Sequence, residues 1–93
     1  MTPAAPKRSP EEVARIGEEI YERRVKPLLK PEDDGKYVAI DIATEDFEID
    51  DNDYTALTRL TDRRRGAQIF MMRINKPYRM SFRMRFGRLA AGP

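Results

Sequence analysis

Hydrophobic and polar residues alternate with two different periods along this chain, and each change of period marks an element of secondary structure. From Ser9 onwards, apolar residues recur every three or four positions, which predicts a helix over residues 10–26. Ser9 fits the N-cap, Pro10 fits the first helical position, and Glu12 completes a capping box with the serine. Pro27 is placed to stop the helix, because proline has no backbone N–H to donate.

Two short segments with a period of two come next. Residues 36–43 and 47–50 read as strands, and residues 44–46 between them are typical of a tight turn. The sequence therefore predicts a β-hairpin. One face of its first strand would carry Val38, Ile40 and Ile42, and the other face Tyr37, Ala39 and Asp41.

Helical spacing returns over residues 50–66. Asp51 or Asn52 is suited to cap this second helix, and Gly66 is suited to follow its last turn. Residues 67–74 form a mostly apolar run. Such a run predicts a strand that is buried on both faces and therefore lies at the centre of the sheet. Residues 75–77 read as a turn.

The last patterned stretch reads PYRMSFRMRFGR, from Pro77 to Arg88, and alternates strictly. Aromatic and methionine side chains take every second position, and Arg79, Arg83 and Arg85 fall between them. This pattern predicts a closing strand with one apolar and one cationic face, with Tyr78, Phe82 and Met84 turned toward the helices.

These elements together predict a single small α+β domain in the order α-β-β-α-β-β, with two helices packed on one face of a four-stranded sheet. We expect the domain to span residues 9–88, between a disordered N-terminal tail (1–8) and a flexible C-terminus (89–93). The predicted core comprises Val13, Ile16, Ile20, Val38, Ile40, Ile42, Leu57, Leu60, Ile69 and Ile74.

The charged residues are unevenly distributed along the chain. Residues 1–58 have a net charge of −7 and residues 59–93 a net charge of +9, which gives the overall +2. Such asymmetry favours contact with nucleic acid or another charged surface, unless the two halves fold together and neutralise each other. The chain has no cysteine and no apolar run long enough to span a bilayer, so we expect a cytoplasmic protein that does not enter the membrane.

The stretch from VAIDI through FEI to the RL of the second helix and the RI before the last turn resembles a group of small bacterial α+β proteins of unassigned function. The resemblance runs from about Glu11 to Phe86. It implies the fold and membership of a two-gene module, as the smaller partner, but no catalytic residues. Asn75 stands where a glycine commonly follows RI. Asparagine also tolerates a left-handed backbone, so the turn is still expected.

The composition argues against an enzyme. The chain has no histidine, and its two serines, Ser9 and Ser81, are a predicted helix cap and a predicted strand residue. Nucleophilic catalysis with a histidine base is thereby excluded. Asp41, Glu45, Asp46 and Glu48 could supply a catalytic pair of carboxylates. The six acids of the stretch EDFEIDDND, residues 45–53, could bind Ca²⁺ or Mg²⁺, but their spacing does not match a calcium-binding loop. A metal-dependent enzyme is therefore the weakest hypothesis, and we expect neither a cofactor nor a bound metal.

The arginines suggest a binding role. Arginine forms bidentate contacts with carboxylates and phosphates, so we expect Arg79, Arg83 and Arg85 to bind a partner, with Arg63, Arg64 and Arg65 extending the positive surface. An acidic protein is the favoured partner, in an antitoxin-like or adaptor role. Nucleic acid is the alternative, and a homodimer through an exposed sheet edge is a further option. Two competing explanations are that the arginines protect an edge strand or pair with acids of the same chain.

Overall fold

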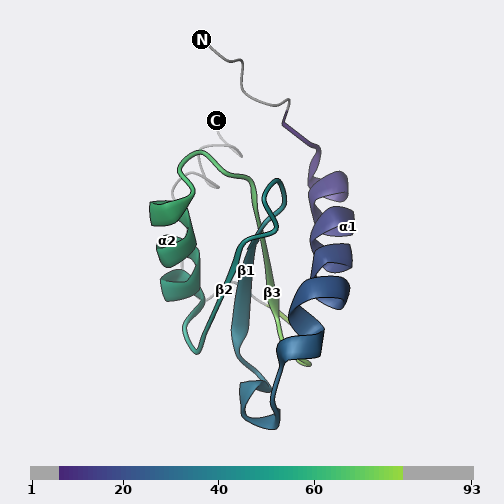
Figure 1. Ribbon diagram of the computed structural model, residues 1–93, viewed down its shortest axis with the longest axis vertical. Helices are drawn as coiled ribbons and strands as arrows, with labels where there is room; N and C mark the ends of the chain where they lie inside the picture. The colour runs from purple at the N-terminus through teal and green to yellow at the C-terminus, as the bar shows by residue number, and fades with distance from the viewer. Residues whose placement is uncertain (1–6, 79–93) are drawn as a thin grey trace.

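Two helices lie on opposite faces of a three-stranded antiparallel sheet in the computed structural model, which describes residues 7–78 (Figure 1). The elements are α1 (Pro10–Ile20), β1 (Tyr37–Asp41), β2 (Phe47–Asp50), α2 (Asp53–Arg63) and β3 (Ile69–Arg73). The strand order is β2-β1-β3, so β1 is the central strand. Tyr37 is the register partner of Asp50 on one side and of Arg73 on the other.

The prediction of two helices on one face of a four-stranded sheet was wrong. Val38 and Ile40 of β1 pack against α1, whereas Ala39, the residue between them, packs with Ala56 and Leu60 of α2. Successive side chains of a strand point to opposite faces, so the two helices must lie on opposite faces of the sheet. β3 was expected to be central but is an edge strand of the described sheet, and each of its residues is half-buried.

The fourth predicted strand, Pro77–Arg88, lies almost wholly outside the described residues. Its first two residues are described and are not in a strand. Tyr78 stacks edge-on against Tyr37 of the central strand and donates a hydrogen bond to Asp53 of α2. Tyr78, the last described residue, thus lies on the α2 face of the sheet.

The first helix begins as its sequence indicates. The Ser9 hydroxyl accepts a hydrogen bond from the backbone N–H of Glu12, and the Glu12 carboxylate accepts one from the N–H of Ser9. The helix then widens into a π-helical turn (Tyr21–Val25) and ends in a 3-10 turn (Lys26–Leu28) that contains the expected Pro27. The wide turn leaves both Tyr21 and Val25 buried, while Leu28 is exposed.

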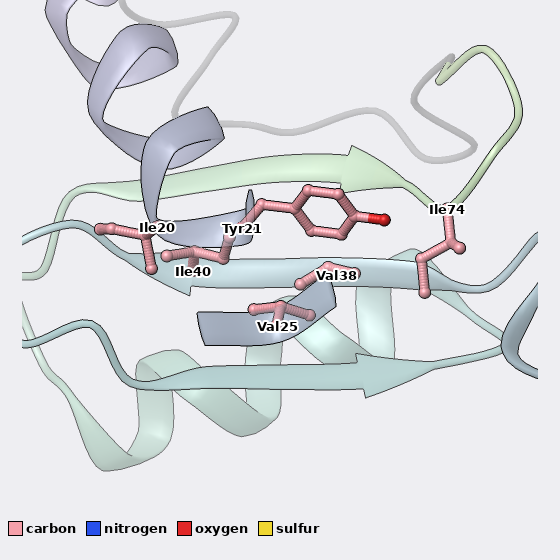
Figure 2. Packing of buried hydrophobic residues seen from close by; sticks show 6 residues of the cluster. All are labelled: Ile20, Tyr21, Val25, Val38, Ile40 and Ile74. Carbon is pink, nitrogen blue, oxygen red and sulfur yellow. The ribbon is translucent and has the colours of Figure 1, made fainter. Parts of the chain in front are cut away.

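The larger core lies between α1 and the sheet. Its buried members are Ile20, Tyr21, Val25, Val38, Ile40 and Ile74 (Figure 2). The smaller core on the α2 side contains Ala39, Ala56 and Leu60. Of the predicted core residues, Ile20, Val38, Ile40, Leu57, Leu60 and Ile74 are buried, whereas Val13, Ile16, Ile42 and Ile69 are half-buried.

Helix α1 approaches β3 very closely at Gly17. A Cβ atom at this position would lie 2.3 Å from the ring of Phe70 and 2.5 Å from its Cβ, well inside van der Waals contact. Glycine within a helix costs about 0.5–1 kcal/mol relative to alanine. The close packing of helix on strand is the structural reason for a glycine at this position.

The two turns at the ends of β1 and β3 depend on polar side chains. Asp41 is buried, and its carboxylate accepts hydrogen bonds from the N–H of Ala43 and the hydroxyl of Thr44, which fix the hairpin turn. Asn75 has a φ of 60° and donates a side-chain hydrogen bond to Asp34. The expectation that asparagine adopts a left-handed backbone in this turn is confirmed.

Candidate functional site: the charged α2–β2 face and the open edge of β3

The arginines at the end of α2 contact acidic side chains of the same chain. Arg63 donates from Nε to Asp46 at 2.9 Å and also pairs with Glu48 through Nη1. Arg64 donates to the same Asp46 oxygen at 3.2 Å. One turn earlier, Arg59 lies 3.5 Å from Glu48 and 3.4 Å from Asp50. The polar face of β2 and one flank of α2 therefore neutralise each other.

This pairing shifts the pKa of two of the groups involved. The hydrogen bond from Arg63, followed by that from Arg64, holds the pKa of the Asp46 carboxyl below its usual value. The same contacts with Asp46 and then Glu48 raise the pKa of the Arg63 guanidinium. Both partners are therefore more firmly charged in the folded state than they would be alone.

Arg65 differs from its two neighbours. It is exposed, and it makes no ion pair with any residue in the range 7–78. Of Arg63, Arg64 and Arg65, which were expected to bind a partner, Arg65 is the one whose charge is not matched by a nearby carboxylate in the described structure. Arg79, Arg83 and Arg85, the other three proposed site residues, lie outside the described residues.

A second charged contact joins the hairpin turn to the first helix. Arg23 forms two hydrogen bonds with the Glu45 carboxylate, at 3.1 and 2.8 Å, and Arg24 lies 3.5 Å away. The bond from Arg23 lowers the pKa of the Glu45 carboxyl. Of the four acids expected to supply a carboxylate pair, Glu45, Asp46 and Glu48 are therefore paired with arginines, and Asp41 is bonded within the hairpin turn.

The outer edge of β2 is partly blocked by side chains. Asp41 and Asp46 form a hydrogen-bonded pair, so Glu48 and Asp50 also direct their backbone groups toward β1, and Phe47 and Ile49 direct theirs outward. The outward N–H of Phe47 donates to the Asp46 carboxylate, and its outward C=O accepts from Arg63. Side chains thus occupy the positions that an added strand would need at Phe47.

The outer edge of β3 has no such protection. Backbone hydrogen bonds from Ile42 to Gln68 and from Ile74 to Lys36 fix which residues of this segment face β1. By alternation, the N–H and C=O groups of Ile69, Met71 and Arg73 point away from the sheet. None of these six groups has a hydrogen-bond partner among residues 7–78. The described sheet is therefore open along β3.

Cationic residues flank both ends of this edge. At the start of β3, the backbone N–H and C=O of Arg8 exchange hydrogen bonds with the side chain of Gln68, and Arg65 lies in the preceding turn. At the other end, the Arg73 guanidinium lies 4.9 Å from the centre of the Tyr37 ring and donates to the backbone C=O of Gly35. The Arg73 side chain is thereby held over the sheet and away from the open edge.

A cluster that the sequence did not predict joins the α2 N-terminus to the end of the described chain. Asp53, in the first turn of α2, is completely buried. The Tyr78 hydroxyl donates to it at 3.3 Å, and the Tyr78 ring stands at 71° to that of Tyr37, with the centroids 5.7 Å apart. Burial, and then the charge of Asp53, raise the pKa of Tyr78. In the sequence, the one sign of this cluster was the presence of Tyr37 and Tyr78. Two tyrosines 41 positions apart are too common to predict a contact between them.

Two features are absent from residues 7–78. No helix in this range is both long enough and apolar enough to cross a bilayer. The same range contains no group of three or more acidic side chains arranged to hold a metal ion.

Comparison of the chain with models of protein families, with curated proteins and with solved structures gave no match. The resemblance to small bacterial α+β proteins therefore stays a prediction.

Proposed function

We propose that this chain is a non-enzymatic binding module that docks on an acidic surface of a protein partner, as an adaptor or antitoxin-like component. The distribution of charge supports this proposal. The arginines of α2 that face β2 are matched by its carboxylates, whereas residues 79–93 contain four arginines and no acidic residue. Arginine without a local carboxylate is well suited to bind carboxylates of another protein.

Exposed Arg65 also supports this proposal, because it is a cation that no carboxylate of residues 7–78 pairs with. The chain also lacks cysteine, which fits a protein of the reducing cytoplasm, and we place it there as part of the proposal. Electrostatic contacts of this kind act mainly on the rate of association and on specificity.

The test is a pull-down with tagged protein from native lysate, at low and high salt and with and without nuclease. The variant replaces Arg79, Arg83 and Arg85 by glutamine. The matched control replaces Lys7, Arg15 and Lys30, which removes the same charge from exposed positions whose side chains make no ion pair within residues 7–78. We expect the wild type and the control to retain an acidic protein, and the variant to lose it. With the purified pair, the association rate should fall about tenfold.

Two outcomes would contradict this proposal. Capture that disappears with nuclease would indicate a nucleic-acid ligand, and three lost phosphate contacts should then flatten the logarithmic salt dependence by about 2–3. A variant with a lower melting temperature and unchanged binding would instead indicate that these arginines serve the fold.

A further inference from the structure

We infer that the open edge of β3 is a strand-addition site for an extended, acidic segment of the protein partner. This inference rests on the proposed function and deepens it by naming the surface and the conformation of the bound segment. In strand addition, backbone hydrogen bonds to the edge supply affinity, and the alternating side chains supply specificity. The outward N–H and C=O groups of Ile69, Met71 and Arg73 provide six such bonding groups in a row.

The contrast between the two edges of the sheet supports the choice of β3. Proteins commonly protect an edge strand with charged side chains. The edge of β2 has that protection, because Asp46 and Arg63 occupy the backbone groups of Phe47. On β3, the one charged side chain is Arg73, and it is held on Tyr37 and Gly35. The open edge is otherwise made of the half-buried apolar residues Ile69–Met72.

Charge defines the side chains of the incoming strand. Ile69, Met71 and Arg73 face α2, and Arg65 lies just before them in the chain. Neither arginine is matched by a carboxylate of residues 7–78, so acidic side chains of the partner should lie on this face. Helix α1 covers the other face and contains four glutamates and one arginine, which disfavours acids there. Apolar side chains are suited to that face, beside the half-buried Phe70 and Met72.

These requirements define a simple probe. A seven-residue peptide that alternates glutamate with valine presents acids on one face and apolar groups on the other, and a peptide that alternates lysine with valine is its charge-reversed control. Backbone amide exchange in the full-length protein is measured by NMR. We expect the glutamate peptide to slow exchange at Ile69, Met71 and Arg73 at least tenfold, and the lysine peptide to leave it unchanged.

A pair of substitutions at one position separates the backbone from the side chain. Met71→Pro removes an outward N–H without touching the hydrogen bonds to β1, and proline is tolerated at such edge positions. Met71→Val changes the side chain and keeps the N–H. We expect the proline variant to bind the glutamate peptide at least tenfold more weakly, and the valine variant to remain within threefold of wild type.

The outcomes distinguish this inference from the proposed function. Absence of protection at the three amides with millimolar peptide would overturn the strand-addition site, even if the pull-down succeeds and depends on the arginines. Slow exchange at these amides before any peptide is added would also overturn it, because the edge would then be occupied by the rest of the chain or by a second copy. If both variants fail to fold, the exchange measurement on the wild type still decides.

Discussion

A single glycine determines how closely the first helix can approach the sheet. Gly17 lies against Phe70 with no room for a Cβ atom. Alanine is the better helix former, so a survey of helix propensity alone would recommend it at this position. The structure indicates the opposite, because the nearest obstruction includes the Cβ of Phe70, which no change of rotamer can move.

We therefore predict that Gly17→Ala destabilises the protein. Overpacking of this kind costs about 1–3 kcal/mol, which exceeds the gain of about 1 kcal/mol from helix propensity. Urea denaturation followed by circular dichroism measures the difference. Arg15→Ala is the control, because Arg15 is exposed on the same helix and should change the midpoint little. A Gly17→Ala variant as stable as the wild type would show that α1 does not approach β3 so closely.

A second prediction concerns the hydrogen bond that the Tyr78 hydroxyl donates to the buried Asp53. Tyr78→Phe keeps the ring contact with Tyr37 and removes the hydrogen bond to Asp53. Hydrogen bonds to charged groups contribute about 1.5–3 kcal/mol, so the free energy of unfolding should fall by an amount near the lower end of that range. Thermal denaturation provides the measurement.

The matched control is Tyr37→Phe, since the Tyr37 hydroxyl has no hydrogen-bond partner among the described residues while its ring contacts both Tyr78 and Arg73. Equal losses in the two variants would mean that the Tyr78 hydroxyl makes no specific contribution.

At the scale of elements, α2 and β2 contact each other through charge as well as through apolar packing. Glu48 and Asp50 face the helix, where Arg59 and Arg63 meet them. Such half-exposed ion pairs contribute little individually, about 0–1 kcal/mol each. Their larger effect here is on arrangement, because they hold Arg63 against the edge of β2 and so keep one edge of the sheet closed.

The pH dependence of stability should reflect this interface. Asp46 has a lowered pKa in the folded protein, so its contribution is complete above the unfolded value of about 4 and is lost as the pH falls through the folded value. We predict that Asp46→Asn lowers the melting temperature at pH 7 by a few degrees. The difference from wild type should close in acid, where both side chains are neutral.

Asp62→Asn is the control for this experiment. Asp62 belongs to α2, next to Arg63, is exposed, and makes no ion pair with residues 7–78. Its substitution should leave the melting temperature nearly unchanged at every pH. A parallel loss in both variants across the pH range would assign the effect to general charge and not to the contact of Asp46 with Arg63 and Arg64.

Local signals in the sequence were sufficient for most elements. The capping box of Ser9 and Glu12, the hairpin around Asp41 and the Asn52 cap of α2, which accepts from Thr55, are all present. Each depends on residues within a few positions of one another. The arrangement of the helices was not predictable in the same way. Residues on both faces of β1 are buried, Val38 and Ile40 on one face and Ala39 on the other, and alternation alone does not say which helix covers which face.

The candidate site was harder to predict than the fold. Arg63 and Arg64 resemble a free basic cluster in the sequence, and their pairing with Asp46 depends on how α2 crosses β2. The open edge of β3 was missed because the run Ile69–Met72 is apolar enough to suggest a central strand. Asp53 is buried and accepts a hydrogen bond from Tyr78, 25 positions away, and no local pattern contains a contact at that separation.

For the molecule as a whole, the charge asymmetry of the sequence has two parts. Within residues 7–78 it is largely balanced by contacts between distant elements, such as Arg23 with Glu45 and Arg63 with Asp46. The remainder belongs to residues 79–93, which carry positive charge alone. Neutralisation within the chain therefore explains Arg59 and Arg63, which pair with acidic side chains in or next to β2. The proposed partner-binding role applies to Arg65 and to the arginines of residues 79–93.

The central position of β1 also has a consequence for the order in which the strands pair during folding. Its pairing with β2 joins residues close in sequence, whereas its pairing with β3 joins Asp41 to Ile69 and Tyr37 to Arg73 across the whole of α2. Closing a longer loop costs more entropy and slows folding.

We expect the hairpin to form before the transition state and β3 to dock after it. Ile49→Val should then mainly slow folding, and Met72→Ala should mainly speed unfolding, in stopped-flow measurements. The reverse assignment would mean that the distant strand is the nucleus. If the expected order holds, a chain emerging from the ribosome leaves the edge of β1 that receives β3 unpaired until residue 73 has been released. This nascent interval is when the sheet is most exposed to association with other chains.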